Sequence, residues 1–129
     1  MLVGDYSRDD YDKVKDMWET QGSACPPIGV LGEKGLICWD GDIPLCAIFI
    51  FQPASEMGMI EFMVANIKAD KKLRNKALDL ILLKAIDLCQ ELGYKYIYTA
   101  SSNIKFISRL EKKGFKRSGL PQQHMFWGL

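Results

Sequence analysis

The stretch between Met59 and Phe115 restricts the possible folds more than any other part of the chain. It reads as an apolar strand, a long helix, a second strand and a second helix, at Met59–Ala65, Lys72–Leu92, Tyr96–Ala100 and from Ser102 or Asn103 to Lys113. Two strands joined by a helix pair in parallel through a crossover. The first strand is too apolar to alternate cleanly, which is typical of a central strand covered on both faces. The pattern predicts a mixed sheet flanked by helices.

The rest of the chain adds strands and one helix to this unit. Ser7 and Asp10 have the spacing of a capping box before a helix that Gly22 ends. Asp40-Gly41-Asp42 separates two apolar runs and predicts a hairpin. The predicted strands outside the central unit are Leu2–Asp5, Gly35–Asp40, Ile43–Gln52, Phe115–Ser118 and His124–Trp127. The predicted order is β-α-β-β-β-α-β-α-β-β, an α/β (α+β) fold.

Length and charge limit the classes of protein. The chain has 129 residues, 48% of them hydrophobic, and this is enough for one domain spanning residues 1–129. Its net charge of +1 gives no overall field for nucleic acid or an anionic membrane. No apolar run approaches the ~20 residues of a membrane span, and the N-terminus has no basic n-region. We therefore expect a cytoplasmic protein without membrane association and without a strong signal for nucleic acid, any contact with which would be local; its oligomeric state is left open.

The sequence gives little indication of a metal site or of disulfide bonds. The four cysteines form no C-x-x-C pair, and His124 is the only histidine. A structural zinc site needs four Cys or His ligands at short spacings. The sequence therefore predicts no metal site.

The run from Asn103 to Phe115, with its Asn, helix and terminal Gly-Phe, together with the element order, resembles the GCN5-related N-acetyltransferase (GNAT) superfamily. The likeness covers nearly the whole chain and is weak before Gly29. Three further segments resemble small phage-encoded acetyltransferase-like members: Glu61-Phe62-Met63-Val64-Ala65-Asn66, Arg74-Asn75-Lys76-Ala77-Leu78 and the closing strand with His124.

The resemblance implies acetyl-CoA as cofactor and an amine as acceptor. In the family, backbone N–H groups at the start of the long helix hold the CoA pyrophosphate, and the preceding strand pairs with the pantetheine arm. The cofactor-binding residues that it implies are Ala65, Asn66, Ile67, Arg74, Asn75, Lys76, Ala77, Leu78 and Asn103. Ala77 stands where the family usually has glycine, and Asp79 brings a carboxylate near the expected phosphate.

Several of these residues have a second interpretation from the sequence alone. The cluster of Lys71, Lys72, Arg74 and Lys76 is also typical of a solvated helix start. Asn66 either binds a ligand or ends strand pairing, because Asn is common at strand ends.

Two residues are the candidates for acid–base chemistry. Glu61 is the one charge in the central strand, and burial would raise its pKa toward the range useful to a general base. The alternative is a Glu on the strand face paired with Lys or Arg. His124 has a side chain suited to proton transfer, although a lone His on a closing strand is usually structural. Leu110 occupies the position where the family often has a Tyr acid.

Two functional hypotheses follow. The first is an acyl-CoA-dependent N-acetyltransferase that modifies a primary amine on a small molecule, a protein lysine or a modified nucleobase. The second is a catalytically idle GNAT-like module that binds a partner or has a structural role, in a phage for example. The sequence does not identify the acceptor.

Overall fold

The computed structural model describes residues 1–119 and Met125. Its elements are, in order, β1 (Leu2–Asp5), the 3-10 helix η1 (Arg8–Asp10), α1 (Tyr11–Thr20), α2 (Ile28–Leu31), β2 (Gly35–Asp40), β3 (Ile43–Phe51), β4 (Met57–Ala65), α3 (Lys71–Glu91), β5 (Tyr96–Tyr98) and α4 (Ile104–Lys112). The first eight predicted elements are present in the predicted order. Within the described residues, no helix is both long enough and apolar enough to cross a bilayer.

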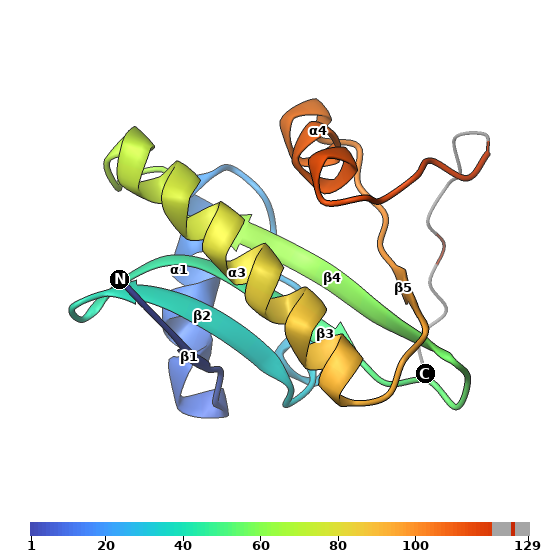
Figure 1. Ribbon diagram of the computed structural model, residues 1–129. Helices are drawn as coiled ribbons and strands as arrows, with labels where there is room; N and C mark the ends of the chain where they lie inside the picture. Colours follow the sequence, from blue (N-terminus) through green and yellow to red (C-terminus); the bar gives the residue numbers. More distant parts are fainter. Residues whose placement is uncertain (120–124, 126–129) are drawn as a thin grey trace.

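The five strands form one mixed sheet in the order β1-β2-β3-β4-β5. The first three pairings are antiparallel, and β2 and β3 form the predicted hairpin around Gly41. β4 and β5 pair in parallel, with Met57 opposite Tyr96 and Met59 opposite Tyr98. α3 is the connection between them (Figure 1). The predicted parallel strand–helix–strand unit is confirmed.

Helices cover both faces of the sheet, and each face has its own hydrophobic cluster. α3 lies across one face (Figure 1), where its Ala77, Ile81 and Ala85 pack on β2, β3 and β4. On the other face, Val14 and Met17 of α1 pack with Leu31 of α2 and with side chains of β3. We call these the α3 face and the α1 face. The central strands are buried on both sides, as the apolar run in β4 predicts.

Three helices end in the same way. Gly22, Gly93 and Gly114 follow α1, α3 and α4 with φ between 87° and 98°. In each case the N–H of the glycine and that of the next residue donate to carbonyls of the last helical turn, the pattern of the Schellman motif. The three predicted helix ends are therefore confirmed, because glycine alone takes this conformation at no steric cost.

The predicted fold needs three corrections. β5 ends at Tyr98 and not at Ala100. The short helix α2, Ile28–Leu31, is not among the predicted elements. The predicted strand Phe115–Ser118 is irregular, because the Phe115 N–H closes the end of α4 by donating to Leu110 and its side chain packs on the α3-face cluster. The predicted strand His124–Trp127 lies outside the described residues, apart from Met125, which is not in a strand.

Gly58, the middle residue of the parallel pairing, allows a test of this packing. A Cβ at this position would lie 2.9 Å and 3.2 Å from ring atoms of Tyr94. Gly58→Ala should therefore lower the free energy of unfolding by about 1–3 kcal/mol, the usual cost of overpacking. Gly29→Ala is the matched control, because a Cβ at that position would have no neighbour within 4 Å and the φ of Gly29 is not positive. Urea unfolding of both variants measures the difference, and equal stability would show that Tyr94 moves aside freely.

Candidate functional site

β4 and β5 separate after only three paired residues, and this separation creates the candidate site. Pairing covers Met57–Met59 of β4, while β4 continues to Ala65 with no described strand on the edge that faces β5; its other edge pairs with β3. The register between β3 and β4 shifts between Ala47 and Phe49, which places one extra residue in β4. Phe62 in this bulge has a φ of 55°, a left-handed conformation rare outside glycine. A bulge bends its strand, so the chain after β5 cannot follow β4.

A cleft of about 1410 Å³ opens along the unpaired edge of β4. This volume exceeds the ~300–1,000 Å³ of a pocket for one drug-sized ligand and has room for two reactants. One wall is formed by the first half of α3 and by α4 with the loop before it. The other wall carries Trp18 and Gln21 from the end of α1, Val30 from α2 and Phe51 from β3.

Glu61 lies in the middle of the cleft. Its Cα pairs with that of Phe49, whose ring is buried on the α1 face, so the two side chains project to the same side of the sheet. The side chain is half-buried, and desolvation raises the pKa of its carboxyl to about 7, while the Ala100 backbone lowers that pKa only in part. The alternative of a strand-face ion pair is not seen: no salt bridge to Glu61 occurs among the described residues. The carboxylate is placed to exchange a proton near neutral pH.

The residues expected to hold the CoA pyrophosphate, Asn75 to Leu78, lie one turn inside α3 and not at its start. The helix begins at Lys71, so the N–H groups from Asn75 to Leu78 donate to carbonyls one turn back and are not free. The N–H groups without helical partners are those of the first turn. Asp70 caps this turn, since its carboxylate accepts a hydrogen bond from the Leu73 N–H at 3.0 Å. Arg74 donates to the carbonyls of Ile67 and Ala69, both at 3.2 Å, and holds the loop before the helix.

Asp79 does not face the first turn of α3. Its carboxylate forms a salt bridge with Arg109 of α4, and Arg109 also donates to the backbone carbonyl of Asn75. The Arg109 side chain is only 19% exposed, whereas that of Asp79 is 55% exposed. The pair therefore joins the two helices that form one wall of the cleft. The expected conflict between Asp79 and a phosphate disappears, because its charge is balanced by Arg109.

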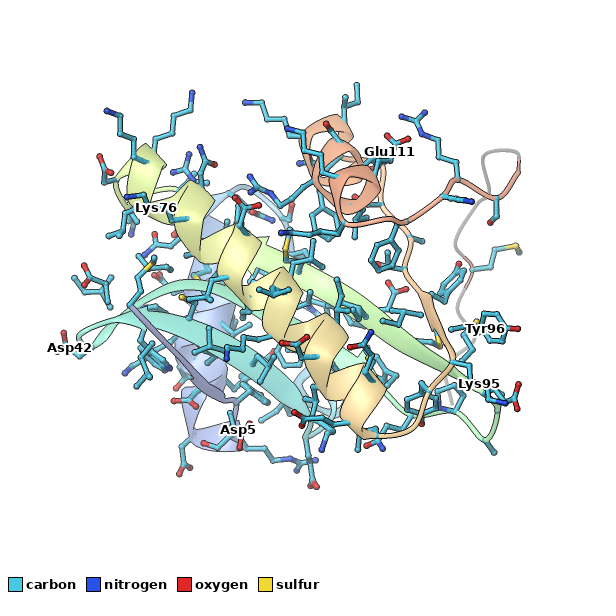
Figure 2. All side chains as sticks on the ribbon, viewed as in Figure 1. Asp5, Asp42, Lys76, Lys95, Tyr96 and Glu111 are labelled. Carbon is cyan, nitrogen blue, oxygen red and sulfur yellow. The ribbon has the colours of Figure 1, made fainter. Side chains whose placement is uncertain are left out.

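The other predicted site residues lie in several different places. Those that line the cleft are Ala65, Ile67, Arg74, Asn75, Leu78 and Asn103. Ala77 is fully buried in the α3-face cluster, and Lys76 is exposed on the side of α3 away from α4 (Figure 2). Asn66 donates to the Pro44 carbonyl at 2.9 Å and accepts from the Lys68 N–H at 3.0 Å, which supports its alternative role as the end of strand pairing. His124 lies outside the described residues.

Asn103 is the N-cap of α4, one of the two residues that the sequence left open for the start of this helix. Its side-chain oxygen accepts from the Phe106 N–H at 3.0 Å. The cap fixes where α4 begins and so fixes which of its side chains face the cleft. Leu110, at the position of the family's frequent Tyr, is buried in the α3-face cluster and does not reach the cleft.

Sequence reasoning missed the cationic face of α4. Lys105, Arg109 and Lys112 all line the cleft, and their spacing of four and three residues places them on one side of the helix. That spacing was readable from the sequence. The aromatic residues Trp18, Phe51 and Phe62 gave no such signal, because their side chains also pack in the core of the α1 face.

The same architecture occurs in solved acetyltransferases. The ribosomal-protein-S18-alanine N-acetyltransferase of Escherichia coli superposes with a TM-score of 0.76 at 10% sequence identity, over 92% of this chain and 79% of that one. An N-acetyltransferase of Staphylococcus aureus Mu50 gives a TM-score of 0.73 at 13% identity, over 92% and 84%. An aminoglycoside acetyltransferase from an uncultured soil metagenomic sample, in complex with sisomicin, gives 0.67 at 8% identity, over 99% and 95%.

These likenesses define the fold. No protein-family model and no curated protein sequence matches the chain. The sheet of five strands with helices on both faces is that of the GNAT acetyltransferases, which confirms the predicted fold class. The narrower resemblance to phage-encoded members stays a prediction.

The raised pKa of Glu61 predicts how stability changes with pH. Because the folded state binds this proton more tightly than the unfolded state, the contribution of Glu61 is full below about pH 4.5 and is lost as pH rises through about 7. Glu61→Gln removes this dependence, so its free energy of unfolding relative to wild type should improve between pH 4.5 and 7.5. The gain should be on the order of 1–2 kcal/mol, less than the full shift implies, because solvent screens a half-buried group.

Chemical unfolding of wild type and variant across this pH range is the measurement. Glu91→Gln is the control, because Glu91 is exposed at the end of α3 and should give a constant difference. A constant difference for Glu61→Gln as well would mean that its carboxyl is not desolvated.

The Asp79–Arg109 pair can be tested by a double-mutant cycle. Removing either side chain should destabilise the protein, and the coupling energy should be about 0.5–1 kcal/mol, because one partner is mostly buried. The exposed Arg117–Glu111 pair, 3.1 Å apart, is the control and should couple more weakly. Unfolding in denaturant at low salt gives both values. A coupling no larger than that of the control would rule out a role in joining α3 to α4.

Proposed function

We propose that this protein transfers an acetyl group from acetyl-CoA to a primary amine. The observation that carries the proposal is Glu61, a half-buried carboxylate with a raised pKa at the unpaired edge of β4, in a cleft whose α3–α4 wall is cationic. The fold is that of acetyltransferases, although fold alone does not establish an activity.

The residues of the cleft suit a molecule with phosphates and a peptide-like arm. The free edge of β4 leaves backbone groups near Ala65 and Ile67 available for such an arm. The first turn of α3 offers unpaired N–H groups, and Lys71, Arg74 and Arg109 line the adjoining wall. Acetyl-CoA would supply a reactive thioester, and CoA would leave as the thiol. We propose that Lys71 and Arg109 add the charge that the missing glycine loop does not provide.

Glu61 would serve as the base. An ammonium group must lose a proton before its nitrogen attacks a carbonyl, and Glu61 accepts that proton directly or through one water. The Tyr98 and Ser101 hydroxyls line the same cleft and are candidates for protonating the departing thiolate. Leu110 is excluded from that role by its burial as well as by its chemistry.

The idle-module alternative has one observation in its favour. Asp70 places a carboxylate on the first turn of α3, where a phosphate would otherwise bind. An N-cap carboxylate stabilises the helix but competes with an anion for the same N–H groups. Binding of CoA distinguishes the two functions, since the idle module does not require it.

Calorimetric titration with acetyl-CoA and CoA tests the proposal. We expect binding in the micromolar range, about −8 kcal/mol. Lys71→Ala should weaken it roughly three- to tenfold, because Lys71 lines the cleft at the helix start. Lys84→Ala is the matched control on the same helix, where the exposed lysine lies outside the cleft. Failure of wild type to bind either molecule would favour the idle module, and equal losses in both variants would indicate non-specific attraction.

A further inference from the structure

The charges along the cleft are unevenly divided. Among the residues that the structure describes, five cationic side chains line it: Lys71, Arg74, Lys105, Arg109 and Lys112. Glu61 is the only carboxylate among the described lining residues. The nine residues that the structure does not describe, 120–124 and 126–129, contain no Asp or Glu. With Glu61 ionised, the described lining side chains therefore carry a net charge of +4, of which Asp79, just outside the lining, balances the share of Arg109.

The cations and the apolar surface lie on different walls. All five cations belong to α3 and α4. The opposite wall carries Trp18, Phe51 and Phe62, which pack in the cluster of the α1 face, together with the uncharged Gln21 and Ser23. The rings of Phe51 and Phe62 meet edge to face with centroids 5.9 Å apart. Glu61 projects to this same face of the sheet, as its pairing with Phe49 requires.

These observations restrict the acceptor amine, and the restriction rests on the proposed function. A single carboxylate balances a single ammonium group. A second ammonium on the same molecule would find no second carboxylate among the described lining residues, and it would approach Lys105 and Lys112, the cations of the other wall that are not assigned to CoA. An apolar body, by contrast, gains from contact with the rings.

We propose that the acceptor is a primary amine with one positive charge and an apolar or aromatic body, bound on the α1 face with its ammonium group at Glu61. Polyamines and other polycations are poor ligands of this cleft. Among the acceptors that the chemistry allows, the charge pattern thus selects hydrophobic monoamines.

Direct binding tests this without requiring turnover. Phenethylamine and tryptamine are titrated against spermidine at matched ionic strength, with and without saturating CoA, by calorimetry. At least one monoamine should bind ten times or more as tightly as spermidine. Glu61→Gln should weaken the monoamine at least tenfold and leave the CoA affinity unchanged. Tighter binding of spermidine, or no loss in Glu61→Gln, would overturn the proposal, as would the absence of monoamine binding at millimolar concentration.

A gain-of-function variant gives a second, independent readout. Gln21→Glu adds a carboxylate to the uncharged wall and should raise the affinity for spermidine at least fivefold. Gln90→Glu makes the same change near the end of α3, outside the cleft, and should not. No difference between these variants would contradict the charge argument.

The two proposals can fail separately. If CoA fails to bind while the monoamine preference holds, the acetyltransferase function fails and the preference of the cleft stands. If CoA binds and spermidine is preferred, the acetyltransferase function stands and the proposed preference for monoamines fails.

Discussion

The parting of β4 from β5 is the constraint on which the rest of the site depends. Three residue pairs hold the two strands together, and the bulge at Phe62 then bends β4 away. A non-glycine residue held at positive φ costs on the order of 1–3 kcal/mol, which the packing of Phe62 against Phe51 helps to offset. The bulge has a further consequence, because it disturbs the alternation of side chains along β4. Phe62 therefore packs on the face to which Glu61 projects, and a charged group lies next to an aromatic wall.

The second wall is fixed by charge pairing between helices. α4 has few contacts with the sheet, and its position beside α3 depends on Phe106 and Leu110 in the core and on the Arg109–Asp79 pair. The carboxylate of Asp79 balances part of the charge of Arg109, and the Arg109 side chain lines the cleft. An isolated exposed ion pair contributes little to stability, so the value of this one lies in its geometry. The salt bridge with Arg109 also explains how the Asp79 carboxylate can lie close to the wall that is proposed to bind phosphate.

The sequence predicted those parts of the fold that local rules determine. The glycines after three helices, the Asp-Gly hairpin and the apolar β4 each have one favourable structure, and all were found as predicted. Positions set by tertiary geometry were missed. The start of α3 was predicted to within one residue, but the residues expected to hold the pyrophosphate, taken from a family pattern that lacks its glycines here, lie one turn inside the helix that Asp70 caps. The length of β5 depends on the bulge in its neighbour, and no residue within Tyr96–Ala100 encodes it. Glu61 could be picked out because a lone charge in an apolar strand is informative by itself. The aromatic residues on the same face could not, because in the sequence an aromatic residue that lines a cleft looks the same as one that packs in the core.

The raised pKa of Glu61 matters because of the proton that it would have to accept. An alkyl ammonium group has a pKa near that of Lys, ~10.4, and an ordinary Glu one near ~4.3, a gap of about six units. With Glu61 at about 7 the gap falls to roughly three units, and each unit corresponds to ~1.4 kcal/mol of the cost of proton transfer. Placing the ammonium beside Glu61 lowers the pKa of the carboxyl again, so the benefit depends on keeping other cations and water away from the pair. The aromatic residues of the α1 face lie on the same side of the sheet as Glu61, and the cations lie on the other wall. The separation of the two walls is therefore what would allow one half-buried carboxylate to serve as the proposed base in a cleft whose other wall is cationic.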